Sequence, residues 1–109
     1  MSNPAPIAIP TYSRLGHLKR AVEALQGNDL ATNSELYIFL DAPKPGDEQK
    51  VAVVRDYVHT IDGFKQVHVI ERSENNLIEN VVGGMRMLTE KHGRVIFLED
   101  DIVVASGFL

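Results

Sequence analysis

The sequence predicts an α/β fold in which helices cover a parallel β-sheet. Short apolar runs alternate along the chain with longer segments whose apolar residues recur every three or four positions. The last run, residues 95–98, is four consecutive apolar residues, as expected of a strand buried on both faces of a parallel sheet. Three strand–helix pairs followed by a final strand predict a parallel sheet with right-handed crossovers.

The first strand–helix unit begins near the N-terminus. Residues 6–10 form a short apolar run, the expected first strand. Ser13 is placed to cap a helix over residues 14–26, and Gly27 with Asn28 is expected to end it. The apolar face of this helix consists of Leu15, Leu18, Val22 and Leu25.

In the second unit, turn-forming residues separate the strand from the helix. The expected strand is 36–40, and it closes on Asp41. Residues 42–46 (APKPG) are typical of a turn. A helix is expected over residues 47–61, stopped by Asp62-Gly63, with an inner stripe of Val51, Val54, Val58 and Ile61.

The third unit leads to the final strand. The expected strand is 67–70, and Asn76 with Glu79 resembles a capping pair for the next helix. His92-Gly93 is expected to stop this helix before the last strand at 95–98. The predicted apolar stripe of the helix is Leu77, Val81, Met85 and Leu88.

Bulk properties narrow the class of protein. The 109 residues are expected to form one domain, 1–109, and the 44% hydrophobic and 24% charged residues are ordinary for a globular protein. The net charge of −4 and the lack of a basic run make nucleic acid an unexpected partner. No apolar stretch approaches the roughly 20 residues that span a bilayer, and the N-terminus does not resemble a signal peptide. Without cysteine there is no disulfide, and a cytoplasmic location is expected.

Three carboxylates directly follow the last strand. Glu99, Asp100 and Asp101 would repel one another unless a cation or a hydrogen-bond donor compensates their charge. Hard divalent cations that bind phosphates are the usual solution. The motif therefore points to a metal-assisted site for a phosphorylated ligand, and a solvated turn is the alternative.

Other polar residues follow the remaining strands. In parallel sheets, ligands bind beyond the carboxyl ends of the strands. A ring or main chain that packs a base, acids that accept from base or ribose, and arginines or a metal that neutralise phosphates would suit a nucleoside diphosphate. The residues expected at this edge are Thr11, Tyr12, Ser13, Arg14, Asp41, the segment from Glu71 and Arg72 through Asn76, and the acids 99–101.

Several of these features also have structural explanations. Asp41 is placed to cap the loop before a proline, Tyr12 to pack, and Arg14 to be a surface charge at a helix start. The four histidines lack metal-ligand spacing and are interpreted as structural or surface residues. Gly83-Gly84 weakens the third helix by roughly 1–2 kcal/mol, so close packing of that helix on the sheet is the favoured explanation.

Some nucleotide-binding classes are excluded by missing motifs. The strand with its acids resembles a Walker B segment, but the sequence has no G-x-x-x-x-G-K-[ST] loop. No G-x-G-x-x-G follows the first strand, which disfavours a dinucleotide fold. A phospho-receiver domain would place an acidic pair after the first strand, where this chain has Thr11 and Tyr12.

The remaining combination resembles a known family. Residues 9–14 (IPTYSR) look like the first-strand signature of GT-A-fold glycosyltransferases, and both the strand ending in Asp41 and residues 97–101 (FLEDD) fit the same layout. The Glu-Asp-Asp form, followed by residues 102–108, is especially similar to the N-acetylglucosaminyltransferase I group. The resemblance covers the whole chain and corresponds to the N-terminal, nucleotide-binding half of such an enzyme. It implies a three-layer, Rossmann-like βαβαβαβ fold with strand order 3-2-1-4.

The resemblance also implies roles for individual residues. Asp101 would bind Mn²⁺ or Mg²⁺ through the diphosphate of a UDP-sugar, with Glu99 as a supporting acid. Asp100 would contact ribose or sugar, and Asp41 the uracil. The other substrate-binding positions implied are Thr11 and Arg14 along the nucleoside, main chain near Tyr12 against the base, and Arg72.

The chain departs from the family pattern in ways that bear on activity. The second strand lacks the Asp-Asp-Gly-Ser ending common in the family, and the loop before the third helix, Asn75-Asn76-Leu77, lacks a frequent glycine. The half that carries the acceptor site and catalytic base is absent from these 109 residues. Three hypotheses follow: a donor-binding half that is inactive alone, an enzyme completed by a partner chain, and a non-catalytic or vestigial interaction module.

The implied strand order also predicts self-association. The last strand, residues 95–98, would be central in a complete enzyme but lies at the edge of a 3-2-1-4 sheet. An apolar edge strand is a template for pairing with another chain. A homo-oligomer is therefore expected, with a two-fold dimer as the first hypothesis.

Overall fold

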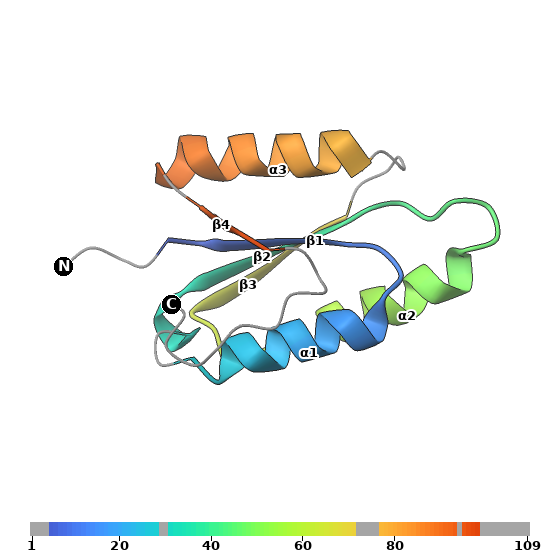
Figure 1. Cartoon of the computed structure of the whole chain (residues 1–109), viewed down its shortest axis with the longest axis horizontal. Coiled ribbons are helices and arrows are strands. Elements are labelled where there is room, and N and C mark those ends of the chain that lie inside the picture. Colours follow the sequence, from blue (N-terminus) through green and yellow to red (C-terminus); the bar gives the residue numbers. More distant parts are fainter. Residues whose placement is uncertain (1–4, 29–30, 72–76, 94, 99–109) are drawn as a thin grey trace.

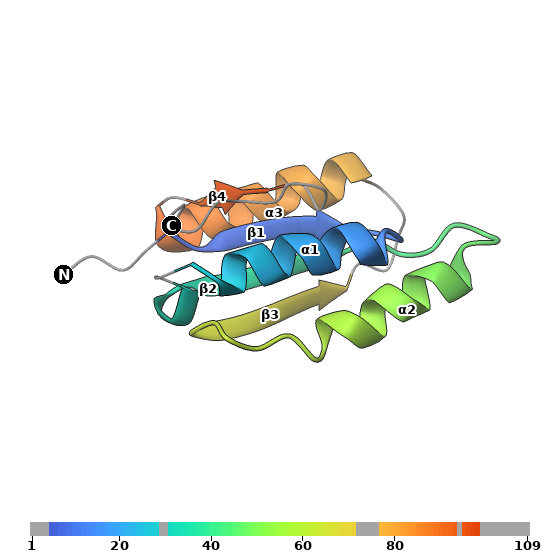
Figure 2. The ribbon, with the colours of Figure 1, turned by 60° about the horizontal axis from the view of Figure 1, so that its bottom comes forward.

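The chain forms a three-layer α/β structure. The computed structural model describes residues 5–28, 31–71, 77–93 and 95–98. Their elements, in chain order, are β1 (Ile7–Thr11), α1 (Leu15–Gln26), the 3-10 helix η1 (Ala31–Asn33), β2 (Glu35–Leu40), α2 (Glu48–Val58), β3 (Gln66–Glu71), α3 (Leu77–His92) and β4 (Ile96–Phe97). The sheet lies between α3 on one face and α1 with α2 on the other (Figure 1). Figure 2 shows α1 and α2 in front of the sheet and α3 behind it.

The sheet is parallel throughout and its strand order is β3-β2-β1-β4. This is the order that the family resemblance implied. Its register aligns Thr11 with Leu40 and Leu40 with Glu71, so β1, β2 and β3 end at one edge. In the described part of the chain, β4 pairs with the beginning of β1, and Ile7 lies opposite Ile96. The amide of Leu98 donates to the carbonyl of Ala8 at 3.0 Å, so β4 runs toward the same edge as β1.

The larger hydrophobic cluster fills the space between the sheet and the helices α1 and α2. The cluster forms because alternate residues of β1 and β2 point to this face of the sheet, and the apolar stripes of both helices pack against them. Ile61 and Leu15 pack against it while remaining partly exposed. Its buried members are Ile7, Ile9, Leu18, Val22, Leu25, Leu36, Ile38, Leu40, Val51, Val54, Val58 and Leu98.

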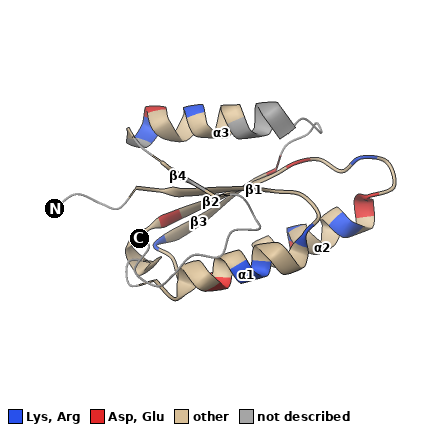
Figure 3. Ribbon diagram, in the orientation of Figure 1, with Lys and Arg blue, Asp and Glu red and all other residues tan. Residues whose placement is uncertain are grey.

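A second cluster lies between α3 and the sheet, and a glycine sets how closely the helix approaches. Its buried members are Ala8, Tyr37, Phe39 and Leu88. A Cβ atom added to Gly84 would lie 2.9–3.1 Å from three ring carbons of Phe39. The prediction that the glycine pair serves close helix–sheet packing is therefore confirmed at Gly84. Charged residues lie mainly on the helices and loops (Figure 3).

Several predicted details of the helices need correction. Ser13 does not cap α1: Arg14 occupies the N-cap position, without a side-chain capping bond, and the helix begins at Leu15. α2 ends at Val58, before the predicted Ile61, and a turn follows. Met85 of the predicted α3 stripe is 39% exposed, whereas Gly84 and Leu88 of the same helix are buried.

The strands also differ slightly from their predicted bounds. β1 begins and ends one residue later than residues 6–10, and β4 comprises two residues where four were predicted. η1 was not predicted from the sequence. The capping pair Asn76 and Glu79 and the side chains of Leu77 and Val81 lie outside what the structure describes. The glycine stop after α3 is confirmed, because Gly93 has φ +78° and its amide donates to the carbonyl of Thr89.

Candidate functional site

The candidate site begins where β1 and β2 end. Thr11 and Asp41 are each 4% exposed, and the amide of Asp41 donates to the carbonyl of Thr11 at 3.3 Å. A nearly buried carboxyl at the carboxyl end of a parallel strand is uncommon, because ionised side chains are rarely buried without a structural or functional reason. The predicted juxtaposition of Thr11 and Asp41 is confirmed, since parallel pairing brings the two strand ends together.

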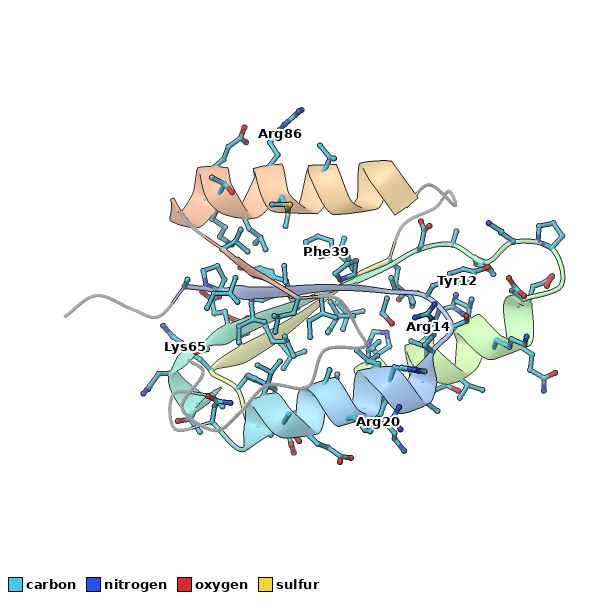
Figure 4. The ribbon with its side chains drawn as sticks, in the orientation of Figure 1. Tyr12, Arg14, Arg20, Phe39, Lys65 and Arg86 are labelled. Carbon is cyan, nitrogen blue, oxygen red and sulfur yellow. The ribbon has the colours of Figure 1, made fainter. Side chains whose placement is uncertain are left out.

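Tyr12 connects the end of β1 to the loop that follows β2. Its hydroxyl accepts a hydrogen bond from the amide of Lys44 at 2.7 Å and donates one to Oδ2 of Asp47 at 2.8 Å. Its ring packs partly exposed against the larger hydrophobic cluster. Figure 4 shows Tyr12 at this end of the sheet, beside the loop. The structural explanation for Tyr12 is thus confirmed, and its hydroxyl has an additional role in the loop.

The surroundings of Tyr12 favour its neutral form. Burial raises the pKa of the hydroxyl above its ordinary value, and the hydrogen bond to Asp47 and the negative charges of Asp47 and Asp41 raise this pKa further. The amide of Lys44 acts in the opposite direction. A neutral phenol can donate to the carboxylate of Asp47, which is the geometry observed.

Arg14 lies at the same end of the sheet, immediately before α1. Its side chain is exposed, and its carbonyl accepts the amide of Leu18 at 3.0 Å. Figure 4 shows Arg14 and Tyr12 in the same region. A cation at the N-terminus of a helix is electrostatically unfavourable, because the helix dipole places partial positive charge there. An anion beside Arg14 would relieve this repulsion.

Glu71, at the end of β3, is paired with the neighbouring helix. Its carboxylate oxygens lie 2.7 Å from Nε of Arg55 and 3.3 Å from Nε2 of His59. The sequence predicts Glu71 at the carboxyl edge, and these two partners are an addition from the structure. Their spacing of four residues, which puts both on one helical face, was the available signal. Glu71 therefore ties α2 to β3 in this structure.

The histidines that the structure describes behave as predicted. His68 of β3 stacks on Tyr37 with ring centroids 4.2 Å apart, and its Nε2 lies 3.1 Å from Oε1 of Glu35. Together with the contact between His59 and Glu71, this supports a structural role. Among the described residues, no group of three or more histidine or acidic side chains is arranged to hold a metal ion.

The other predicted site residues cannot be placed. Arg72, Glu99, Asp100 and Asp101 all lie outside the described residues. The structure thus brings together Thr11, Asp41, Tyr12 and Arg14 at one edge of the sheet, and the acidic motif stays a prediction. No helix in the described part of the chain has both the length and the apolar character needed to cross a membrane.

A parallel sheet with helices on both faces and polar residues at its carboxyl edge defines a Rossmann-like α/β protein. Residues 7–109 match the family described as Glycosyl transferase family 2. The chain therefore belongs to glycosyl transferase family 2, which confirms the resemblance at the level of the family. A comparison with curated proteins gave no match.

A solved structure shares the fold. The crystal structure of TarS from S. aureus is similar with a TM-score of 0.59 and 16% sequence identity. The similarity covers 88% of this chain and 16% of the TarS chain. The chain thus corresponds in fold to a small part of TarS, namely part of a GT-A fold.

Proposed function

We propose that this chain binds a UDP-sugar through a divalent metal ion, as the nucleotide-binding part of a GT-A glycosyltransferase. The observation that carries the proposal is the family match over residues 7–109, which suggests a nucleotide-sugar ligand. The nearly buried Thr11 and Asp41, side by side at the carboxyl edge, support it. The finer similarity to the N-acetylglucosaminyltransferase I group is part of the proposal.

The proposed contacts fall into two groups of residues at the carboxyl edge of the sheet. In the first group, which follows β1 and β2, Asp41 would accept a hydrogen bond from the uracil. Thr11 and Arg14 would lie along the nucleoside, and main chain near Tyr12 would face the base. Arg14 also suits an anionic ligand, because the positive end of the α1 helix dipole repels its charge and an anion would offset this repulsion.

The second group of contacts would come from the residues that follow β4 and β3. Asp101 would hold Mn²⁺ or Mg²⁺ against the diphosphate, with Glu99 in support, Asp100 on ribose or sugar, and Arg72 near the phosphates. The direction of β4 supports this assignment, because the strand runs toward the edge that holds Asp41. Oxygen ligands of this kind suit either cation.

Calorimetry with UDP in the presence of Mn²⁺ or of EDTA tests the proposal. We expect weak, saturable binding that requires the metal, and we expect Asp101→Ala to abolish the metal dependence because the diphosphate loses its cation bridge. Asp62→Asn is the matched control, since Asp62 is an exposed acid after α2, at the opposite end of the sheet. Absence of any heat at millimolar UDP with Mn²⁺ would contradict the proposal.

Glycosyl transfer by these 109 residues alone is not part of the proposal. Transfer requires an acceptor held in line with the activated donor. We expect slow hydrolysis of UDP-sugar at most, measured as UDP release. Transfer of sugar to any acceptor at ordinary enzymatic rates by the purified chain would overturn this expectation.

Self-association is the second proposal, and the position of β4 favours it. β4 is an edge strand of the described sheet, and α3 exposes Val82, Met85 and Met87 at 39–47%. A second copy that pairs along β4 would cover this edge. Light scattering at tens of micromolar is expected to report a dimer, and a stable monomer would refute the proposal.

A further inference from the structure

The loop between β2 and α2 contains a well-defined tight turn. The amide of Asp47 donates to the carbonyl of Lys44 at 3.0 Å, and Gly46 has φ +97°. Pro45 precedes Gly46, so the residues match the proline and glycine positions of a type II turn. The carboxylate of Glu48 accepts a hydrogen bond from the amide of Gly46 at 2.9 Å. This bond connects the turn to the first residue of α2.

The hydroxyl of Tyr12 is bonded to both ends of this turn. It accepts from the amide of Lys44, the first turn residue, and donates to the carboxylate of Asp47, the last. These partners are 32 and 35 residues away from Tyr12 in the sequence. The ring of Tyr12 is itself held by packing against the larger hydrophobic cluster. One side chain thus joins the residue after β1 to the whole turn after β2.

The turn is closely connected to Asp41. Only residues 42 and 43 separate Asp41 from Lys44, and the amide of Asp41 is bonded to the carbonyl of Thr11. The segment 41–47 is therefore fastened to the end of β1 at its beginning and at its turn. A loop held in place before binding avoids the entropy of ordering it when a ligand arrives.

We propose that Tyr12 is a positioning residue whose hydroxyl holds the Lys44–Asp47 turn against the end of β1 and so sets the conformation of the loop after Asp41 for nucleotide binding. The inference rests on the proposed function for the nucleotide and deepens it. Because the hydroxyl is already hydrogen-bonded to the turn, its removal would change nucleotide affinity through the conformation of the loop. This role is distinct from a contact between main chain near Tyr12 and the base.

Hydrogen exchange of the Lys44 amide tests the hold on the turn without any ligand. Residues 43 and 45 are prolines without amide hydrogens, so Lys44 is the reporter between them. We expect Tyr12→Phe to speed this exchange about tenfold, because the acceptor of the amide is removed. Tyr57→Phe is the matched control, since it removes a phenol hydroxyl near the end of α2 and should leave the exchange unchanged.

The acceptor side of the contact supplies a rescue experiment. Asp47→Ala removes the acceptor of the Tyr12 hydroxyl and is expected to speed Lys44 exchange severalfold. Asp47→Asn keeps an acceptor oxygen and is expected to stay within about twofold of the unchanged chain. The double variant of Tyr12→Phe and Asp47→Ala should be no worse than Tyr12→Phe, because both changes break one connection.

Affinity for UDP with Mn²⁺ then tests the consequence. We expect Tyr12→Phe and Asp47→Ala each to weaken binding about five- to tenfold, with Asp47→Asn and Tyr57→Phe unchanged. Unchanged Lys44 exchange in Tyr12→Phe overturns the inference, and so does faster exchange with full affinity. If the unchanged chain fails to bind UDP, the proposed function falls, while the exchange result still decides whether Tyr12 holds the turn.

Discussion

Replacing Gly84 by alanine is expected to destabilise the chain, although alanine is the better helix former. The added Cβ would meet three ring carbons of Phe39 at 2.9, 3.0 and 3.1 Å, whereas carbon atoms in favourable contact are about 3.5–4.0 Å apart. Phe39 is 2% exposed, so its ring has little space to move away. The helix α3 must therefore shift outward or the ring must leave its preferred rotamer.

Two opposing effects set the magnitude. Gly→Ala inside a helix contributes up to about 1 kcal/mol of stability, and overpacking a core costs about 1–3 kcal/mol. Because three ring atoms overlap with the added carbon, the upper part of the second range applies. We expect a net loss of about 1–2 kcal/mol in the free energy of unfolding, or a drop in Tm of about 4–8 °C for each kcal/mol.

Urea unfolding followed by circular dichroism measures this difference. Gly16→Ala is the matched control in α1, because its added Cβ would meet only Nη1 of Arg20, at 3.9 Å. The control should gain up to about 1 kcal/mol, so the two variants are expected to differ in sign. Phe39→Leu in the Gly84→Ala background should recover part of the loss. A Gly84→Ala variant at least as stable as the unchanged chain would refute the reasoning.

Three further outcomes are expected. Leu88→Ala should cost about 2–5 kcal/mol in urea unfolding, because this residue of α3 is fully buried against the sheet. Above about pH 10 the chain should lose stability, because burial raises the pKa of both Tyr12 and Tyr57 in the folded state and the unfolded chain therefore releases these protons first. Thermal melts at rising pH measure this loss, which should be smaller in Tyr12→Phe. Arg55→Ala should change stability by less than about 1 kcal/mol, because its pair with Glu71 is exposed, and a larger loss in the same urea experiment would contradict this.

Much of the architecture could be predicted because the chemistry of the strands is local. The apolar run of β2 is bounded by a polar residue and by Asp41, so its predicted and observed limits differ by one residue. The end of α2 was predicted too late because Ile61 continues the apolar spacing. It does pack against the core, but from the segment after the helix. Periodicity alone cannot separate these two cases.

The candidate site was predictable to the extent that topology determines it. Parallel strands bring Thr11 and Asp41 to one edge, and no further information was needed for that inference. The bonds from Tyr12 to Lys44 and Asp47 depend on how a loop folds back over more than 30 residues, which no local pattern encodes. The pairing of Glu71 with Arg55 likewise depends on the docking of α2 beside β3.

The unequal covering of the two sheet faces has a consequence for how the molecule opens. Among the side chains that the structure describes, two helices on one face share a cluster of twelve buried residues, and the cluster between α3 and the other face has four. Native proteins unfold in parts, and segments with less buried apolar contact open at lower free energy. α3 is therefore expected to detach as a unit while β1, β2, α1 and α2 remain folded. In that partly open form the ring of Phe39 would lose the contact with Gly84 and face solvent.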